Sequence, residues 1–443
     1  MAVQSKPRIA VIGGGCSGLA AAARLAEAGI PAALIEASPQ LGGRARGLQW
    51  KDQLLDNGQH ILLGAYSETL RLLNLAGVDQ NLALLRLPLQ LTMHDQFRLS
   101  AQGGVPAPLH ILLGLLRAKG LSLRERLAAI RLMAWMKLIG FTLAQDETLQ
   151  NLLARKAQPA RLIKLLWEPI CLAALNTPVQ NASAQVFLNV LRDSFTKARS
   201  DSDMLLPRCN LSTLLAEPLA AYIKSRGGHI QTSASVATLH PVNNGFLVCT
   251  EDGANAEFTH VIIAVSSFRL PALLSHIPAL AEIANLSTQF KYQPIYTIYL
   301  QYPTTVKLNM AMTGLAEGYS QWVFDRGSLC GQHGLLAVVV SAEGLHQKLT
   351  QENLALAVAK ELASAFPQLP APLWHKVIAE KRATFTCSAN LQRPLQKTPV
   401  PDLYLAGDYT TDGDRTSAYP ATIEGAVRSG VQCADQVIAQ LSV

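Results

Sequence analysis

Short apolar runs alternate with longer helical patterns over the first 80 residues of the chain. The run from Arg8 to Ile12 precedes a helix-like segment at residues 19–28, and a second apolar run follows at residues 31–35. This alternation is typical of a doubly wound sheet, in which helices connect neighbouring strands. The alternation returns after residue 228, and residues 261–265 form another short run typical of a buried strand.

Two long segments interrupt this pattern. Residues 105–200 have an almost wholly helical pattern, whereas residues 291–385 mix strands with one helix. We therefore expect an α/β fold in which a Rossmann-like, doubly wound domain carries an inserted α+β domain. The expected doubly wound domain combines residues 1–85, 205–290 and 386–443, and the inserted domain combines residues 86–204 and 291–385.

A glycine-rich loop, Gly13-Gly-Gly-Cys-Ser17-Gly18, joins the first predicted strand to the first predicted helix. In a dinucleotide-binding loop Gly13 permits the tight turn, Gly15 lets the backbone approach a pyrophosphate, and Gly18 lets helix and strand pack closely. The helix N-terminus near Ser17 presents free N–H groups and a partial positive charge to phosphate. Glu36 ends the second strand at the spacing expected for a carboxylate that binds ribose hydroxyls. The alternative is a glycine-rich turn that binds no ligand.

Further segments distinguish a flavin dinucleotide from a nicotinamide one. Gly43 and Arg44 follow closely and place backbone and a guanidinium where both can reach the same pyrophosphate. Near the other end of the chain a strand ends in Gly407-Asp408, whose carboxylate suits a ribityl chain. Thr422-Ile423 opens the last predicted helix and directs N–H groups toward the pyrimidine edge of a flavin. Together these segments predict bound FAD, although Gly407-Asp408 alone also fits an ordinary strand-to-turn exit.

These motifs resemble those of the flavin amine oxidase and phytoene desaturase superfamily, and further segments resemble one branch of it, the hydroxysqualene dehydroxylases. The segments that carry the closer resemblance are Asp56–Ile61, Gly64–Tyr66, Trp167–Pro169, Ala173–Pro178, Pro207-Arg208, Leu211-Ser212 and Pro420–Ala426. All matching segments together span residues 8–430, which is almost the whole chain. The stretch between Asp408 and Pro420 departs from the resemblance, because it is longer and more polar than the short link expected there.

The resemblance implies an FAD enzyme that reductively removes the allylic hydroxyl of hydroxysqualene, a hydrophobic isoprenoid, and releases squalene. It also implies that Gly58 lies near the flavin and that Val236 lies against the adenine ring, although a plain sheet valine explains Val236 equally well. Two alternatives stay open. One is a carotenoid- or phytoene-type desaturase that works in the oxidative direction, and the other is a flavin-free chaperone of the same fold that binds prenylated lipids. The resemblance indicates no electron donor.

Loss of the hydroxyl as water requires a general acid within hydrogen-bond reach of the oxygen. His60 and Gln59 are the candidates, His60 because its pKa suits proton transfer near neutral pH. The alternative for His60 is a turn residue held by backbone groups. The polar loop offers three further candidates for the acid, Asp412, Asp414 and Arg415, although a solvated loop explains them more simply. Three aromatic residues are expected either in a hydrocarbon tunnel or in the core: Trp167, Trp322 and Tyr419.

The amino-acid composition indicates where the protein works and what it contacts. Charged residues make up 16% of the chain and the mean hydropathy is +0.19, which is apolar for a water-soluble protein. No stretch matches a membrane span or a signal peptide, so we expect a cytoplasmic protein. The net charge of +7 comes without a nucleic-acid-binding motif and favours contact with anionic lipid. The seven cysteines lack metal-ligand spacing, so no metal is expected, and a flavin tether through Cys387 has no local support.

Residues 122–140 predict a helix with two apolar faces. Ser122 and Glu125 have the spacing of a capping box. The first face consists of Leu123, Leu127, Ile130, Ala134 and Leu138, the second of Leu132, Trp135, Met136 and Ile139, and Arg124, Arg126, Arg131 and Lys137 flank the first. One interpretation is that one face packs on the protein while the other enters lipid at the inner face of the membrane. The alternative is a helix buried on both sides.

Overall fold

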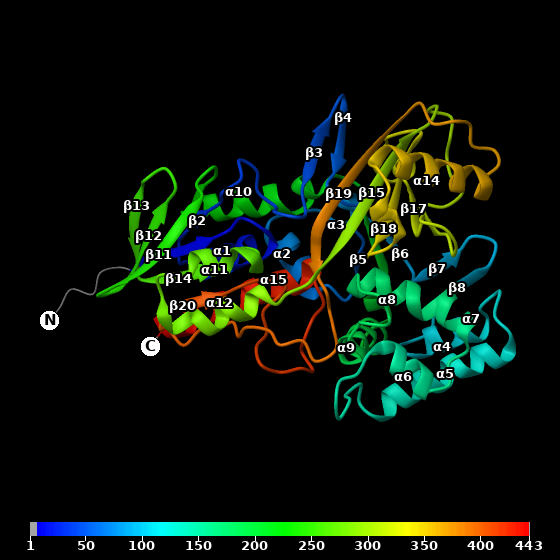
Figure 1. Cartoon of the computed structure of the whole chain (residues 1–443), viewed down its shortest axis with the longest axis horizontal. Helices are drawn as coiled ribbons and strands as arrows, with labels where there is room; N and C mark the ends of the chain where they lie inside the picture. The colour runs from blue at the N-terminus through cyan, green and yellow to red at the C-terminus, as the bar shows by residue number, and fades with distance from the viewer. Residues whose placement is uncertain (1–6, 443) are drawn as a thin grey trace.

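A five-stranded parallel sheet forms the base of one half of the molecule in the computed structural model, which describes residues 7–442 (Figure 1). In sheet order its strands are β10 (His229–Gln231), β2 (Ala32–Ile35), β1 (Ile9–Ile12), β14 (His260–Ile263) and β20 (Leu403–Leu405). All neighbours pair in parallel, for example Ile9 with His260 and Val261 with Leu403. The expected doubly wound sheet is confirmed, and its strands come from three separated parts of the chain.

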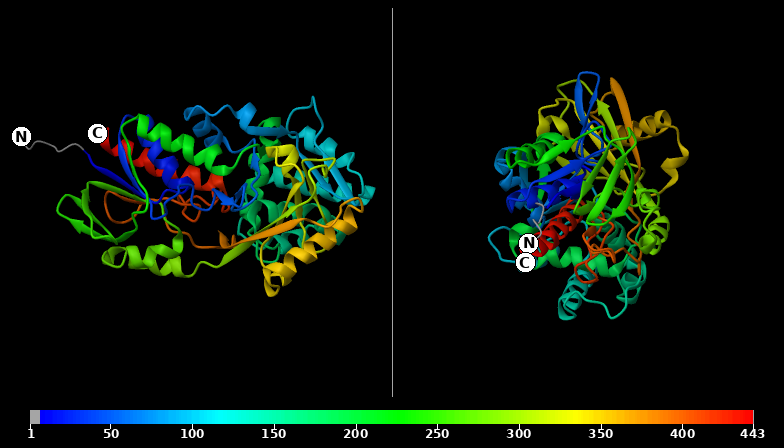
Figure 2. Two further views of the ribbon diagram at one scale, coloured as in Figure 1. Left: turned by 90° about the horizontal axis from the view of Figure 1, so that it is seen from above. Right: turned by 90° about the vertical axis from the view of Figure 1, so that its left-hand side faces the viewer.

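In the part of the chain that the structure describes, this half also contains seven helices and a small antiparallel sheet. The helices are α1 (Cys16–Glu27), α2 (Ser67–Leu75), α3 (Gln80–Ala83), α10 (Glu217–Ser225), α11 (Leu270–Leu273), α12 (Ala281–Thr288) and α15 (Ile423–Leu441), and the small sheet holds β11 (Val236–Val242), β12 (Gly245–Thr250) and β13 (Asn255–Phe258). The helix expected from residue 19 begins at Cys16, so its N-terminus directly follows the glycine-rich loop. α1 and α15 lie side by side in both views of Figure 2.

A seven-stranded mixed sheet forms the base of the other half. In sheet order its strands are β19 (Trp374–Phe385), β15 (Tyr292–Gln301), β18 (Leu335–Ser341), β17 (Trp322–Asp325), β16 (Met312–Gly314), β7 (Gln90–Met93) and β8 (Phe97–Ser100). Neighbouring strands of this sheet pair antiparallel, except that β16 and β7 pair in parallel. α13 (Arg326–Cys330) follows β17, and α14 (Gln351–Ala365) packs on one face of the sheet. The long strands β15 and β19 lead from the centre of the molecule into this half (Figure 1).

A layer of helices completes this half, as the pattern of residues 105–200 predicted. It contains α4 (Leu109–Leu116), α5 (Leu123–Leu138), α6 (Leu149–Arg155), α7 (Ala160–Leu162), α8 (Glu168–Leu175) and α9 (Ala184–Phe195). Short 3₁₀ turns lie at Arg199–Ser202, Ser267–Arg269, Pro278–Leu280 and Leu345–Lys348, and π-helical turns at Ile163–Trp167 and Ser212–Ala216. Among residues 7–442, no helix combines the length and hydropathy needed to cross a bilayer.

Two small sheets lie where the halves meet. One is the hairpin of β3 (Gly47–Trp50) and β4 (Gln53–Asp56), and the other pairs β9 (Met204–Pro207) with β5 (Leu62–Leu63) and β6 (Leu84–Leu87). The divisions expected after residues 85 and 204 would cut β6 and β9. We propose the same discontinuous division of the chain, with the first piece extended to residue 87 and the second beginning at residue 204.

The exposure of side chains on α5 distinguishes the two interpretations of its apolar faces. Its capping box is confirmed, since Ser122 Oγ accepts from Glu125 N at 3.3 Å and the Glu125 carboxylate accepts from Ser122 N at 2.7 Å. Leu132 and Met136 are buried, whereas Leu123 is 66% and Leu138 85% exposed. The alternative of a helix buried on both sides is therefore wrong.

Gly430 in α15 provides a test of the helix contact on which this half depends. A Cβ atom at Gly430 would lie 2.0 Å from the backbone oxygen of Ser17, so Gly430→Ala should push α15 away from α1. We expect the free energy of unfolding in urea to fall by about 1–3 kcal/mol, although Ala otherwise stabilises a helix interior by about 1 kcal/mol over Gly. Gly103→Ala is the control, because nothing lies within 4 Å of its Cβ position. Equal stability of the two variants would contradict the close helix contact.

Candidate active site

A cavity of about 530 Å³ extends from the carboxyl ends of β1, β2, β14 and β20 to the face of the seven-stranded sheet. Ligands of open α/β sheets bind at this edge. The cavity brings together all but one of the residues that the sequence indicated for the cofactor, together with the two main candidates for the acid: Gly13, Gly15, Ser17, Glu36, Gly43, Arg44, Gly58, Gln59, His60, Val236, Gly407, Asp408, Thr422 and Ile423. Gly18 does not line the cavity and lies behind the loop. We call this space the cofactor cavity.

The three glycines of the loop differ in what surrounds them. Gly13 has a φ of +111°, and a Cβ there would lie 2.5 Å from the backbone oxygen of Ala264. A Cβ on Gly18 would lie 1.8 Å from the oxygen of Gly13, so helix and loop touch through backbone. By contrast, the nearest atom to a Cβ on Gly15 would be Gly43 Cα at 4.0 Å. Gly15 therefore keeps open space in the cavity next to the backbone.

The N-termini of two helices meet at this cavity. Cys16 and Ser17 of α1 line it, as do Thr422 and Ile423 at the start of α15. Thr422 caps α15, its Oγ1 accepting from Gly425 N at 3.1 Å. Two helix N-termini in one cavity favour a ligand with several anionic or electron-rich oxygens, because both offer free N–H groups and a partial positive charge.

The charged side chains of the cavity are fixed by specific partners. The Glu36 carboxylate accepts from Gly14 N at 2.5 Å and from Ser38 N at 2.7 Å, which holds it beside the loop. Arg44 Nη2 donates to Asp408 Oδ2 at 2.7 Å, and its Nη1 donates to the backbone oxygen of Ala383 at 2.7 Å. The sequence assigned Arg44 and Asp408 to different parts of a cofactor, and it did not indicate that they form an ion pair.

Tyr409 lines the same cavity, and the sequence gave no signal for it. Its side chain is 2% exposed, and its hydroxyl has no hydrogen-bond partner within the described part of the chain. Buried hydroxyls in proteins are nearly always hydrogen-bonded. The hydroxyl oxygen has almost no surface open to the cavity, so it is not evidence for a ligand there.

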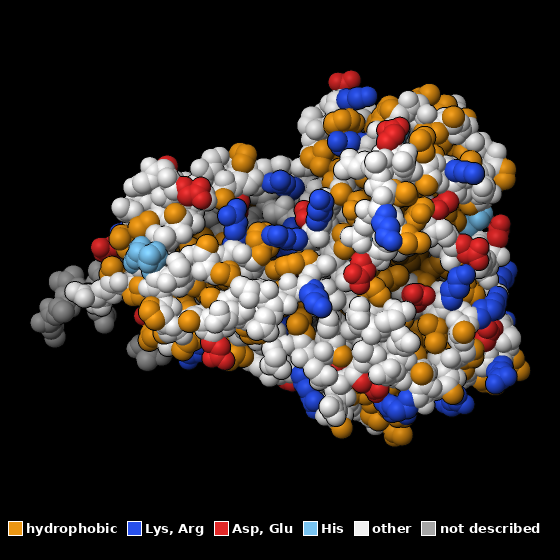
Figure 3. Space-filling model, in the orientation of Figure 1, with side chains coloured by type: hydrophobic (Ala, Val, Ile, Leu, Met, Phe, Trp, Pro, Cys, Tyr) orange, Lys and Arg blue, Asp and Glu red, His pale blue; other side chains and the backbone are white. Residues whose placement is uncertain are grey.

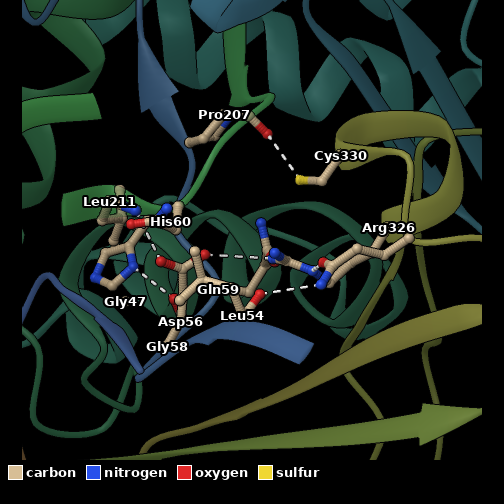
Figure 4. A network of polar contacts seen from close by, with 12 residues as sticks. Gly47, Leu54, Asp56, Gly58, Gln59, His60, Pro207, Leu211, Arg326 and Cys330 are labelled. Carbon is tan, nitrogen blue, oxygen red and sulfur yellow. Dashed lines mark hydrogen bonds and ion pairs between the residues drawn. The ribbon is translucent and has the colours of Figure 1, made fainter. Parts of the chain in front are cut away.

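Gln59 belongs to a buried network that joins the two halves (Figure 4). Arg326 Nη1 lies 2.9 Å from Gln59 Oε1 and 3.4 Å from Asp56 Oδ2, and Asp56 Oδ1 accepts from Leu211 N at 2.8 Å. Asp56 and Arg326 are 3% and 2% exposed. Burial raises the pKa of the Asp56 carboxyl, and the Arg326 guanidinium opposes that rise. The side-chain oxygen of Gln59 is thus engaged with Arg326, a residue that sequence reasoning missed.

His60 is placed in the cofactor cavity but in a state that suits proton donation poorly. Its Nδ1 lies 2.8 Å from the backbone oxygen of Gly58, and burial lowers the pKa of the imidazole. When a neutral His60 donates from Nδ1 to this carbonyl, its Nε2 carries a lone pair and no proton, so Nε2 can accept a hydrogen bond but cannot donate one. The general-acid role of His60 stays a prediction, and this geometry does not support it.

A second cavity of about 160 Å³, which we call the apolar cavity, adjoins the first. Its walls are mostly aliphatic and come from α4, α5, α8, α9 and neighbouring strands. Trp167 and Tyr419 line it, and Trp322 lines both cavities. The residues shared by the two cavities are Ile61, Tyr66, Ala173, Ala174, Trp322 and Thr422.

The remaining sequence candidates lie outside both cavities. Asp412, Asp414 and Arg415 are exposed, and the two carboxylates accept hydrogen bonds from Ser417 and Thr416 within their own loop. Their placement agrees with a solvated loop. Cys387 is buried in the core, and burial raises the pKa of its thiol to about 12. Within residues 7–442, no cluster of three His, Cys, Asp or Glu side chains has the geometry to hold a metal ion.

Comparison with known proteins places the chain in a family. The model of the flavin-containing amine oxidoreductases matches residues 16–438. Hydroxysqualene dehydroxylase of Rhodopseudomonas palustris is 30% identical over 97% of this chain and 98% of its own length, and 15-cis-phytoene desaturase of an Oncidium hybrid is 24% identical over 97% and 77%. Cyclohexylamine oxidase of Brevibacterium oxydans has a similar fold, with a TM-score of 0.72 over 99% of this chain and 100% of its own at 16% identity. The chain therefore belongs to the flavin-containing amine oxidoreductases, and within them to the hydroxysqualene dehydroxylases, and it is an FAD-dependent oxidoreductase.

Proposed function

We propose that this enzyme reductively removes the allylic hydroxyl of hydroxysqualene and releases squalene. The observation that carries the proposal is the apolar cavity, which shares six lining residues with the cofactor cavity. A hydrocarbon chain in the apolar cavity would present its reacting carbon at the junction of the two. The relative named hydroxysqualene dehydroxylase supports this substrate.

The residues of the cofactor cavity fit FAD. We propose that the glycine-rich loop and the N-terminus of α1 hold the pyrophosphate, that Glu36 binds the adenosine ribose, and that Val236 contacts the adenine. Arg44 would hold the pyrophosphate and Asp408 the ribityl chain. The start of α15 would bind the pyrimidine edge of the flavin. When bound and reduced, FAD supplies hydride chemistry at this cavity.

The protein's own contribution is to orient the isoprenoid and to exclude water from the junction. Most walls of the apolar cavity lack polar groups, and the ring of Trp322 offers a π face to positive charge that develops on an allylic carbon. A phytoene-type desaturase would use the same scaffold in the oxidative direction. Membership of an FAD-dependent family favours an enzyme over the flavin-free lipid chaperone.

The first test is the reaction itself. Purified enzyme is incubated anaerobically with chemically reduced FAD and hydroxysqualene, and the products are identified by mass spectrometry. We expect squalene, because the hydroxyl leaves as water and the carbon gains a hydride. Running the mixture with oxidised FAD and either squalene or phytoene is the control for the opposite direction. Oxidation of those hydrocarbons, without any squalene from the alcohol, would assign the protein to the desaturases.

Gly15 allows the cofactor assignment to be tested separately from folding. In Gly15→Val the new side chain has room in the protein, since the nearest atom to its Cβ is 4.0 Å away, but it enters the space assigned to the pyrophosphate. We expect a folded protein that has lost its flavin absorbance near 450 nm. Circular dichroism checks the fold. Stoichiometric FAD in a folded Gly15→Val protein would refute the assignment of the loop.

We further propose that α4 and α5 place the enzyme on the cytoplasmic face of a membrane. Leu109 and Leu116 of α4 and Leu123, Leu127 and Leu138 of α5 are all exposed. The lower right of the space-filling view shows basic and apolar side chains next to one another over these helices (Figure 3). Ile111 and Leu115 of α4 and Met133 of α5 line the apolar cavity, so these two helices separate it from the surface. An isoprenoid would then enter from lipid without crossing water.

The basic residues of α5 make this membrane proposal testable. Arg124, Arg131 and Lys137 are exposed, whereas Arg126 donates to the backbone oxygens of Leu116 and Leu121 and is not available to lipid. Changing the three exposed residues to Gln should weaken binding to anionic liposomes by up to about 3 kcal/mol, at about 1 kcal/mol for each charge near the surface. Co-sedimentation at low salt measures the effect.

A matched variant controls for the loss of net charge. Lys307, Lys348 and Lys360 are exposed and lie outside α4 and α5, with Lys360 on α14, and changing them to Gln removes the same charge. This control should keep the binding of the unmodified protein. Equal binding of both triple variants would remove α5 from the membrane contact.

A further inference from the structure

The junction of the two cavities offers few polar side chains. Of the six residues that line both cavities, only Tyr66, Trp322 and Thr422 carry a polar side-chain atom. Thr422 is engaged as the cap of α15. The Trp322 indole can donate a hydrogen bond but does not release a proton in water. Tyr66 is thus the titratable side chain of the junction.

Other polar groups of the apolar cavity are already paired or lie off the junction. Tyr419 donates to Asp193 Oδ2 at 2.6 Å, and Trp167 Nε1 donates to Gln158 Oε1 at 2.9 Å. Ser202 Oγ donates to the backbone oxygen of Arg199 at 2.8 Å. Ser194 lines this cavity but not the cofactor cavity. Within the described chain, two polar side chains act on the Tyr66 hydroxyl: Glu424 through its charge and Thr422 through a hydrogen bond.

The backbone around Tyr66 is firmly held. Gly64 N donates to Asp203 O at 2.8 Å and Ala65 N to Asp201 O at 2.9 Å. A Cβ on Gly64 would lie 1.8 Å from the oxygen of Ser200, so the loop fits closely against this turn. On the other side, buried Glu424 of α15 accepts from the N–H groups of α2, which starts directly after Tyr66. A side chain carried by a backbone that is held from both sides is positioned for a specific contact.

We propose that the Tyr66 phenol binds the allylic hydroxyl of the isoprenoid and protonates it as the C–O bond breaks. This assignment rests on the proposed function, because it requires an allylic alcohol at the junction. The Tyr66 O–H bond breaks, the leaving oxygen takes its proton, and water departs. The carbon that loses oxygen gains a hydride equivalent from the reduced cofactor. The Tyr66 phenolate regains a proton from solvent, so atoms and electrons balance.

The chemistry of the phenol suits this step. Burial raises the pKa of Tyr66, with a further contribution from Glu424, so the phenol is protonated at physiological pH and acts as a donor. The departing group develops the character of hydroxide, whose conjugate acid, water, has a pKa of about 15.7. The proton therefore moves to the stronger base once the C–O bond lengthens. Trp322 lines the same junction, and its aromatic ring can stabilise the cation that remains.

Binding to the oxidised holoenzyme tests the contact without turnover. Hydroxysqualene and squalene are titrated in detergent micelles while the flavin absorbance is followed. We expect the unmodified enzyme to bind the alcohol about 2–10-fold more tightly than the hydrocarbon, as one hydrogen bond provides. Tyr66→Phe should abolish that preference while it retains FAD and binds squalene unchanged. An unchanged preference in Tyr66→Phe would overturn the contact.

Turnover with two leaving groups tests the proton transfer. The analogue in which chloride replaces the allylic hydroxyl needs no acid to leave. Tyr66→Phe should lose about 10²–10⁴-fold in rate on the alcohol and stay close to the unmodified enzyme on the chloride, after correction for solvolysis. Tyr419→Phe removes a phenol of the apolar cavity alone, so its ratio of the two rates should stay within about twofold of the unmodified ratio.

The outcomes separate the two proposals. If the unmodified enzyme yields no squalene, the proposed function fails, and the Tyr66 assignment fails with it. If squalene forms but Tyr66→Phe slows the reaction of the alcohol and of the chloride equally, Tyr66 is structural and the inference is overturned. If His60→Gln, and not Tyr66→Phe, shows the loss confined to the alcohol, the proton comes from His60 and the inference is likewise overturned.

Discussion

The close contact of α1 with α15 is the constraint on which the cofactor cavity depends. At Gly430 the backbone of α15 meets the backbone of α1, because a side chain there would overlap the carbonyl oxygen of Ser17. This contact brings the first helix and the last helix of the chain together with their N-termini at one cavity. Neither helix alone could provide two sets of free N–H groups, so the site depends on a pairing of the two ends of the sequence.

The junction of the cavities depends on a second constraint, the buried polar network between the halves. Arg326 from the start of α13 reaches Asp56 and Gln59, and the Tyr299 hydroxyl donates to the backbone oxygen of Asp56 at 2.9 Å. Buried ion pairs add little net stability, but losing one partner leaves an uncompensated charge. Such a network therefore favours one relative position of the two halves. Gln59, His60 and Ile61 lie three to five residues after Asp56 and line the cofactor cavity at that position.

Sequence reasoning succeeded where the signal was local. The glycine-rich loop, the spacing to Glu36 and the capping box of α5 each depend on residues close together in the chain, so their physical meaning could be read directly. The ion pair of Arg44 with Asp408 and the contact of Arg326 with Gln59 join residues 364 and 267 positions apart. No local pattern indicates such partners. The orphaned hydroxyl of Tyr409 was equally hidden, because burial without a partner is a property of the folded chain.

Polarity falls in steps along the line from the cofactor cavity to the surface of α4 and α5. The cofactor cavity is rich in backbone N–H groups and charges, the junction holds Tyr66 and Thr422, and the apolar cavity beyond is walled mainly by aliphatic side chains. An isoprenoid alcohol in this gradient has one favourable orientation. Its hydroxyl would lose hydrogen bonds in the apolar cavity, at a cost of about 1–3 kcal/mol for an unpaired polar group, whereas its hydrocarbon chain gains from burial there. The same gradient would hold the polar end of the substrate against the redox cofactor, so that no charged group has to bind the hydrocarbon.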